Sequence, residues 1–303
     1  MELKILQTDA LRLEVLPEAG ASIVAFGIRG SERFVPLMRA TPLEAIAAAN
    51  SSQMASFVLA PFSNRLRDAA FRFSGRTFQL EPNCTGGFAI HGCVRKRPWE
   101  VLAIDQESMR LRFESARFDG LDFPFPFRVD LTYALRDDTL EVDLRLRNQG
   151  AESMPAGFGL HPYYERSLLD PSENVELCMR TGGTYEGLCP RRAARPLRRS
   201  EDFSVRRSLP REGFDTCFAA WDGRADLFWP KSRVRAEIEC NAPLGHVILF
   251  TPPGEKFFAL EPVSNANNGF NLLADGIPGS GVTVLESEEE MSATFRLRVH
   301  GAE

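Results

Sequence analysis

The residues with the clearest chemical potential are polar side chains in short segments rich in apolar and aromatic residues. An imidazole can give or take a proton near neutral pH. A carboxylate among apolar residues has a raised pKa, which makes it a more effective general base. The four segments of this kind are Ala60–Asn83 with Asn64 and Arg65, Ile90–Gly92 with His91 and the later Trp99, Gly157–Tyr164 with His161, and Phe257–Pro262 with Glu261. Together they suggest general acid–base chemistry.

Each of these residues also has an ordinary structural interpretation. Asn64 could form a turn in a surface loop, and His91 beside Gly92 could be structural, although glycine lets a backbone approach a ligand closely. His161 could be a buried, hydrogen-bonded core histidine, and Glu261 could be a surface carboxylate at a strand end. The individual signals are weak, so any assignment depends on their combination.

Motifs for other kinds of chemistry are missing from the sequence. It has no glycine-rich phosphate loop, no HExxH, no GxSxG and no dinucleotide fingerprint. Its six cysteines lie nine or more residues apart without a CxxC pair, which fits neither a zinc site nor a dense disulfide framework. We therefore expect buried free thiols in a reducing compartment, no metal site and no cofactor.

The elements that must position these residues are mostly strands. Apolar residues alternate with polar ones through residues 127–147 on both sides of an Asp137-Asp138 turn, which predicts an antiparallel hairpin. Residues 71–80 predict a second hairpin around Ser74-Gly75. Further strands are expected at residues 111–113, 236–240, 246–251, 257–260 and 293–299.

Helical periodicity is scarce in this chain. Only Thr41–Ala49 suggests a short helix, with Thr41 as its N-cap and Pro42 at its first position. Many short strands separated by Gly, Pro and Asn turns indicate an all-β sandwich or barrel. Without a repeat, a linker or a change in composition, residues 1–303 are expected to form a single domain.

Composition excludes several classes of protein. The 303 residues are 44% hydrophobic and 25% charged, which is typical of a globular chain. With 36 basic and 41 acidic residues the net charge is −5, which argues against a nucleic-acid partner. The charged N-terminus resembles no signal peptide, and the uncharged stretch from Ala45 to Asn64 is too polar to span a membrane. We therefore expect a cytoplasmic protein with no membrane association.

In combination, the segments resemble the aldose 1-epimerase (galactose mutarotase) family. The resemblance extends from about Leu3 to Val299 and depends on five motifs in order: PFSNRLRDAAFRFSGRTFQLEPN, IHG followed by Trp99, GFGLHPYY, FDTCF and LEPVSNANNGFN. It implies a large antiparallel β-supersandwich with very little helix. It also implies an isomerase of carbohydrate metabolism that interconverts sugar anomers without a cofactor.

The resemblance also implies roles for individual residues. Glu261 of the LEP segment would be the general base, and His161 of LHPYY the general acid. The residues that would contact substrate hydroxyls or the ring oxygen are Asn64, Arg65, His91 and Asp215 of FDTCF. The sequence departs from many relatives in the short segment Cys93–Pro98 and at Arg67-Asp68, so the preferred sugar stays open.

This chemistry requires a defined protonation state. Glu261 must begin ionised to take the proton of the C1 hydroxyl, and His161 must begin protonated to deliver one to the ring oxygen. From sequence we expect the neighbouring carboxylate to raise the pKa of His161.

Several alternatives stay open at this stage. One is a hexose-6-phosphate 1-epimerase in which the arginine-rich stretch Arg191–Arg199 contacts the phosphate, although that stretch could equally be a solvated loop. Another is a carbohydrate-binding protein without turnover. A glycoside hydrolase is more distant, because no pair of catalytic carboxylates is evident. The sugar would be a small-molecule substrate of a monomer or homodimer.

Overall fold

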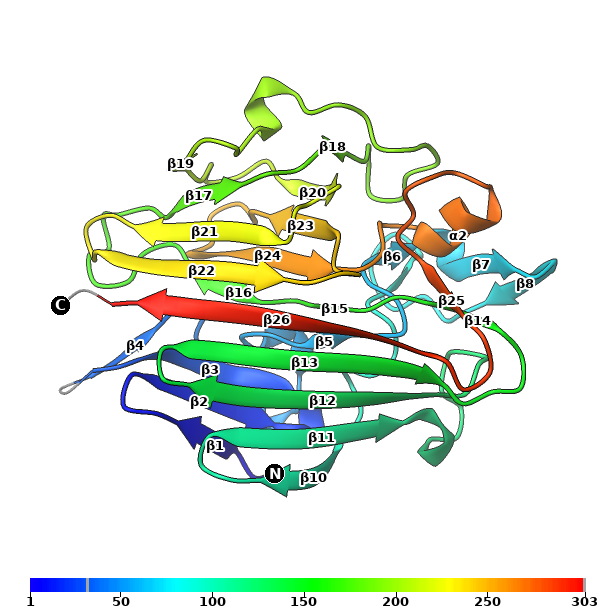
Figure 1. Cartoon of the computed structure of the whole chain (residues 1–303), viewed down its shortest axis with the longest axis horizontal. Coiled ribbons are helices and arrows are strands. Elements are labelled where there is room, and N and C mark those ends of the chain that lie inside the picture. The colour runs from blue at the N-terminus through cyan, green and yellow to red at the C-terminus, as the bar shows by residue number, and fades with distance from the viewer. Residues whose placement is uncertain (31–32, 302–303) are drawn as a thin grey trace.

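The computed structural model describes residues 1–30 and 33–301. In these residues all pairs of adjacent strands within the sheets are antiparallel, and only two α-helices occur. Figure 1 shows long strands running side by side across the molecule, with further strands in a layer behind them. The prediction of an all-β fold with very little helix is therefore confirmed.

The largest sheet has nine strands and forms the front layer of Figure 1. In sheet order it consists of β10 (Glu100–Ile104), β11 (Ser108–Glu114), β12 (Phe127–Arg136), β13 (Thr139–Asn148), β26 (Glu290–His300), β22 (Val234–Cys240), β21 (Arg224–Trp229), β17 (Glu176–Met179) and β19 (Arg207–Ser208).

The second sheet has seven strands, most of them short, and carries the candidate catalytic residues. It consists of β18 (Gly183–Thr184), β20 (Asp215–Ala219), β23 (His246–Phe250), β24 (Phe257–Val263), β15 (Gly159–Leu160) and β5 (Val58–Leu59), with β16 (Tyr163–Glu165) pairing beside β15 on β24.

Four smaller sheets complete the fold. The N-terminal sheet contains β1 (Lys4–Gln7), β2 (Leu11–Leu16), β3 (Ser22–Arg29) and β4 (Phe34–Pro36). The two-stranded sheets are β6 (Arg65–Leu66) with β9 (Ala89–Ile90), β7 (Ala70–Phe73) with β8 (Arg76–Gln79), and β14 (Met154–Ala156) with β25 (Thr283–Leu285).

The hairpin predicted at residues 127–147 forms as β12 and β13. Val129 pairs with Leu146 and Leu131 with Leu144, so the apolar residues of both strands face one side. Burial alternates along both strands, with these residues buried and the polar ones between them partly or fully exposed. Alternating apolar residues thus place one face of this sheet in the core. The second predicted hairpin forms as β7 and β8.

The helix prediction needs correction. The helix α1 spans only Leu43–Ala47 and its N-cap is Pro42, whose side chain has no hydrogen-bonding group. The Thr41 hydroxyl instead donates to the carbonyl of Val24, 2.6 Å away, so a tertiary contact takes the side chain expected to cap the helix. A second short helix, α2 (Gly269–Ala274), was not predicted, because six residues are too few to show a helical period.

The cysteines are less buried than the sequence led us to expect. All six cysteines are free thiols, but only Cys217 is buried and the other five are partly exposed. Within residues 1–30 and 33–301, no helix is long and apolar enough to cross a membrane.

Candidate active site

The central feature of the site is a contact between two enclosed side chains, Glu261 and His161. The Nε2 atom of His161 lies 3.2 Å from Oε1 of Glu261, and the two side chains are 5% and 3% exposed. The other heteroatom of each group, Nδ1 of His161 and Oε2 of Glu261, is enclosed and has no hydrogen-bond partner within the described residues. The pair therefore leaves two enclosed polar atoms without a hydrogen-bond partner among the described residues.

Neighbouring strands of the second sheet bring these two residues together. Glu261 lies inside β24, opposite Ile248 of β23, so it is neither at a strand end nor on the surface. His161 directly follows β15, which pairs with β24. The backbone N–H of His161 donates to the carbonyl of Phe57, 3.0 Å away. The surface interpretation of Glu261 is therefore wrong.

Aromatic rings fix the orientation of the imidazole. The ring centroid of His161 lies 4.5 Å from that of Phe57 and 4.5 Å from that of Tyr163. The Tyr163 hydroxyl is 3.5 Å from Nε2 of His161. A side chain held between two rings has little rotational freedom, so its Nε2 stays directed at Glu261.

Burial drives both members of the pair towards their neutral forms. Loss of water raises the pKa of Glu261 well above its usual value, and the charge of Asp215 adds to this shift. Loss of water lowers the pKa of His161 well below its usual value, and the positive charges of Arg39 and Arg95 lower it further. The pKa of His161 is thus lowered, opposite to the direction expected from sequence, because sequence patterns do not report how completely a site is dehydrated.

A second polar pair is formed by Arg65 and Asp215, 150 residues apart in the chain. Nη2 of Arg65 donates to Oδ2 of Asp215 at 3.3 Å, and the two side chains are 19% and 30% exposed. The amide oxygen of Asn64 accepts from the backbone N–H and from Nη1 of Arg65, at 2.9 and 3.1 Å. Asn64 is itself buried, so it positions the guanidinium that the resemblance assigns to the substrate.

His91 lies against the catalytic pair. Its ring centroid is 5.0 Å from that of His161 at an edge-to-face angle, and its Nδ1 is enclosed without a partner among the described residues. Burial, together with the charge that a protonated His161 would carry, lowers its pKa. The next residue, Gly92, has a positive φ of 63°, and an added Cβ would come within 1.8 Å of the carbonyl oxygen of Ala60. Glycine is required here for this close approach.

One buried polar residue in this region was not identified from sequence. Asn267 follows β24 within the LEPVSNANNGFN segment, and its amide oxygen is enclosed without a partner in the described part of the chain. The amide group of Asn267 donates to the carbonyl of Leu188 at 3.3 Å, while the backbone N–H of Asn268 donates to the carbonyl of Arg65 at 2.7 Å. The repeated asparagines were a visible signal, but nothing in the sequence distinguished a site residue among them.

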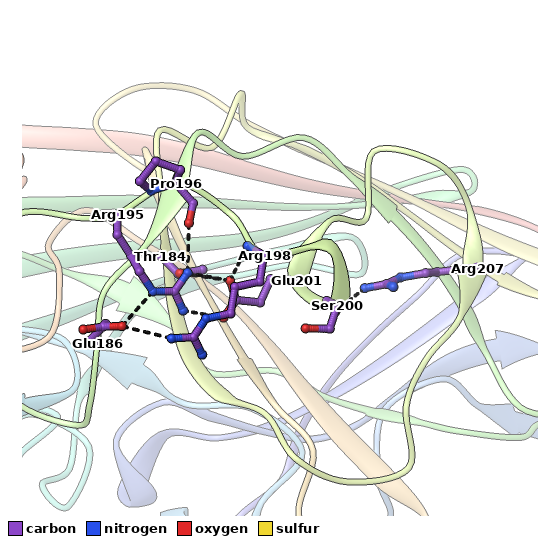
Figure 2. A network of polar contacts seen from close by, with 8 residues as sticks. All are labelled: Thr184, Glu186, Arg195, Pro196, Arg198, Ser200, Glu201 and Arg207. Atoms are coloured by element: carbon purple, nitrogen blue, oxygen red, sulfur yellow. Dashed lines mark hydrogen bonds and ion pairs between the residues drawn. The ribbon is translucent and has the colours of Figure 1, made fainter.

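The arginine-rich stretch Arg191–Arg199 forms a separate network of ion pairs, shown in Figure 2. Arg195 donates two hydrogen bonds to Glu201, at 2.6 and 2.8 Å, and one to Glu186 at 2.9 Å. Arg198 also contacts Glu186, at 3.1 Å. Acidic side chains of the same loop region therefore already neutralise two arginines that were considered for a phosphate contact.

From sequence we expect no metal site. Across residues 1–30 and 33–301, no three His, Cys, Asp or Glu side chains are grouped as metal ligands.

Comparison with known proteins gives matches over nearly the whole chain. The family description "aldose 1-epimerase" matches residues 5–298 of the chain. The uncharacterised protein YphB of Escherichia coli K12 is 29% identical over 311 residues, which cover 99% of both chains.

Two solved structures show the same fold. A structure from Escherichia coli K12, provisionally described as an aldose 1-epimerase, has a TM-score of 0.84 and 26% identity, with 99% of both chains covered. A galactose mutarotase-like protein from Clostridium acetobutylicum also has a TM-score of 0.84, at 17% identity, with 100% of this chain and 99% of that chain covered. The galactose mutarotase-like fold implied by the sequence motifs is therefore confirmed.

Proposed function

The chain belongs to the aldose 1-epimerase family, and from this premise we propose that it interconverts the α and β anomers of an aldose by acid–base ring opening. Glu261 is the proposed base and His161 the proposed acid. The observation that carries the proposal is the enclosed contact of 3.2 Å between them, with one unpartnered polar atom on each residue.

The proposed reaction moves two protons. Ionised Glu261 takes the proton of the C1 hydroxyl while protonated His161 gives one to the ring oxygen, and the C1–ring-oxygen bond breaks to leave an open-chain aldehyde. Rotation about C1–C2 exposes the opposite face of the carbonyl. Ring closure then returns both protons and gives the other anomer.

Burial favours the ring-opening step in this scheme. When the ring opens, the ion pair of Glu261 and His161 becomes a neutral carboxylic acid and a neutral imidazole. Dehydration of the two side chains shifts both pKa values in the direction of that neutral state. Starting from the ion pair, both proton transfers of ring opening are therefore favourable.

The remaining residues are proposed to hold the sugar. Arg65 and Asp215 offer donors and acceptors for hydroxyl groups, and His91 supplies an enclosed ring nitrogen. Asn64 is proposed to act mainly through Arg65, because its amide oxygen is occupied by that residue.

Polarimetry of freshly dissolved α-anomers tests the proposal. We expect the protein to accelerate the approach to anomeric equilibrium for at least one sugar in a panel of aldoses and sugar phosphates. Glu261→Gln protein with an unchanged melting temperature is the matched control and should give the uncatalysed rate. A purified, folded wild-type protein that accelerates none of the panel would contradict the proposal and favour a carbohydrate-binding role.

A further inference from the structure

The chain between β18 and β19 contains a loop, residues 185–194, that is closed at its base. The backbone N–H of Thr184 donates to the carbonyl of Arg195, and the N–H of Arg195 donates to the carbonyl of Thr184, both at 2.9 Å. The ion pairs of Arg195 with Glu186 and Glu201 reinforce this closure (Figure 2). A short loop whose two ends meet is an Ω-loop, a type that often has a functional role.

The tip of this loop, Leu188–Pro190, is held by side chains from two distant segments of the chain. Each of its three consecutive backbone carbonyls accepts a hydrogen bond from a different side chain. The donors are Nδ2 of Asn267 to Leu188 at 3.3 Å, Nη2 of Arg67 to Cys189, and Nδ2 of Asn268 to Pro190 at 2.9 Å. In Figure 1 the chain after β18 passes beside the beginning of α2, where Asn268 lies. These three donor residues are called the latch below.

The site is more open at one end than at the other. The side chains of Arg65 and Asp215 are 19% and 30% exposed. Those of His161 and Glu261 are only 5% and 3% exposed. A sugar therefore reaches the enclosed catalytic pair from the side of Arg65 and Asp215, which is the entrance of the site.

The latch and the loop tip lie beside this entrance. The backbone N–H of Asn268 donates to the carbonyl of Arg65 at 2.7 Å, so the latch directly adjoins a residue of the entrance. Burial raises the pKa of the Cys189 thiol, whereas the charges of Arg67 and Arg65 lower it. The thiol at the loop tip is thus within electrostatic range of both guanidinium groups.

Asn267 connects the loop tip with the interior of the site. Its amide oxygen is enclosed and has no hydrogen-bond partner within the described residues. Burial raises the pKa of the Cys217 thiol, the backbone N–H of Asn267 lowers it, and the charge of Glu261 raises it further. Cys217 and Glu261 both pair with Ile248 of β23, so their side chains lie on the same face of the sheet. The latch therefore adjoins the face that carries the proposed base.

We propose that the loop tip Leu188–Pro190, held by Arg67, Asn267 and Asn268, is a fixed wall at the entrance that restricts the protein to monosaccharides. A loop closed at its base, with all three tip carbonyls bound, moves aside only if those hydrogen bonds break. A second sugar unit must extend out of the enclosed site through the entrance, where it meets this wall. The inference rests on the proposed epimerase function. It gives a role to Arg67, at which the sequence departs from many relatives.

A cavity lies next to the latch. Arg67 and Asn268 line a space of about 330 Å³, together with Arg191, which directly follows the loop tip. Shortening a latch side chain would therefore enlarge a space that already borders the loop. This makes a gain in the use of longer sugars the expected result of loosening the latch.

A comparison of sugars of different length tests the proposal. The panel contains glucose and three reducing disaccharides that carry a second glucose at O3, O4 or O6, namely nigerose, maltose and isomaltose. Anomeric exchange measured by magnetisation-transfer NMR gives kcat/KM for each. We expect the value for glucose to exceed that for each disaccharide by about 10-fold or more, a factor typical of discrimination by pocket shape. A disaccharide used as efficiently as glucose would overturn the proposal.

Latch variants separate a wall from a general role in structure. Arg67→Met removes one donor to the loop tip and keeps the aliphatic stem. Asn268→Gly removes another donor, and glycine tolerates the positive φ of 57° at this position. Each variant should raise the ratio of kcat/KM for the best-used disaccharide to that for glucose by about 10-fold.

Arg192→Gln is the matched control, because Arg192 is an exposed arginine of the same loop outside the latch. It should leave the ratio of the two kcat/KM values unchanged. A loss of stability alone lowers both values together and leaves their ratio constant. An unchanged ratio in both latch variants would therefore overturn the proposal.

Binding of analogues that cannot open distinguishes failure of this inference from failure of the epimerase function. The analogues are 1,5-anhydroglucitol and 1,5-anhydromaltitol, which lack the C1 hydroxyl and require no turnover. Calorimetry should show about 10-fold weaker binding of the larger analogue to wild type and a smaller difference for Arg67→Met. That result would support the wall even if no sugar were epimerised. Equal binding of the two analogues by wild type would overturn it whatever the activity.

Discussion

Two buried glutamates, Glu261 and Glu201, have opposite environments. Glu201 is 11% exposed at its side chain, and it accepts hydrogen bonds from the guanidinium of Arg195, the backbone N–H of Arg198 and the hydroxyl of Thr184 (Figure 2). The Arg195 guanidinium lowers the pKa of Glu201 to about 2. Glu261 is 3% exposed, its one ion-pair contact within the described residues is with His161, its Oε2 has no hydrogen-bond partner there, and burial raises its pKa.

The difference separates a carboxylate that stabilises the fold from one that is available for chemistry. A carboxylate whose lone pairs are all occupied holds its charge firmly and is a poor base. A carboxylate left without partners destabilises the folded protein but takes up a proton readily. Satisfied hydrogen bonds therefore indicate a structural role for Glu201, and unsatisfied ones indicate a functional role for Glu261.

The largest expected effect comes from removing the proposed acid or base. Glu261→Gln keeps the shape but cannot accept the proton, and His161→Asn removes the titratable ring. Each variant should lose at least about 100-fold in kcat, on the order of 3 kcal/mol, with a much smaller change in KM. The double variant should be little worse than the poorer single one.

Stability provides the control for this prediction. Because Oε2 of Glu261 has no partner in the described structure, Glu261→Gln should not lower the melting temperature. A folded Glu261→Gln protein that turns over near the wild-type rate would contradict the assignment, and Asp215 would then be the next candidate base.

The pH profile of kcat/KM, which reports the free protein, should show which member of the pair titrates on each side. The reactive pair holds one proton in total. Because the pKa of His161 is lowered and that of Glu261 is raised, this single proton is carried by Glu261. The acidic limb should therefore report protonation of His161, which gives the pair its second proton. The basic limb should report loss of the last proton, from Glu261.

This assignment of the limbs is the reverse of the one expected from unperturbed side chains. On either side of the optimum, kcat/KM should fall by about tenfold per pH unit. NMR of the His161 ring as a function of pH should show a neutral imidazole across the optimum in the free protein. A ring that stays protonated through neutral pH would contradict the assignment.

A smaller effect is expected at the polar pair that is proposed to hold the sugar. Arg65→Ala and Asp215→Ala each remove one hydrogen-bonding group and leave the acid and base in place. We expect KM to rise by about 10-fold in each variant, as for the loss of a hydrogen bond to a charged group. Steady-state kinetics on the preferred sugar measures this, and unchanged KM and kcat in both variants would show that the pair contacts no substrate.

Local patterns predicted the strands well, because the alternation of apolar and polar residues is visible in neighbouring positions of the sequence. The hairpin of β12 and β13 formed as expected for that reason. The motif resemblance also selected Glu261 and His161, which the fold brings into contact. The family and the fold were therefore accessible from sequence.

What sequence could not show depends on residues that meet only in the folded protein. Arg39, Arg95 and Asn267 have no local pattern that separates them from neighbouring polar residues, and their burial arises from contacts with distant segments. The direction of the His161 pKa shift likewise depends on dehydration and on these arginines. The alternation of apolar and polar residues along a strand shows neither the burial of these residues nor the direction of the His161 pKa shift.

The smallest effect on catalysis is expected at Glu201, whose substitution should change stability and leave kcat/KM unchanged. Glu201→Gln weakens the hydrogen bonds from Arg195 and should lower the free energy of unfolding by about 1–3 kcal/mol at neutral pH. Arg198→Gln removes only an ion pair between two exposed side chains and should change it by less than about 0.5 kcal/mol. The pKa of Glu201 falls from 4.5 to about 2 on folding, so its contribution is present above pH 4.5 and is lost as the pH falls towards 2. Urea denaturation should therefore show the difference between wild type and Glu201→Gln shrinking with acidification, while kcat/KM at neutral pH is unchanged. A Glu201 variant that lost activity but not stability would reverse the roles assigned to the two glutamates.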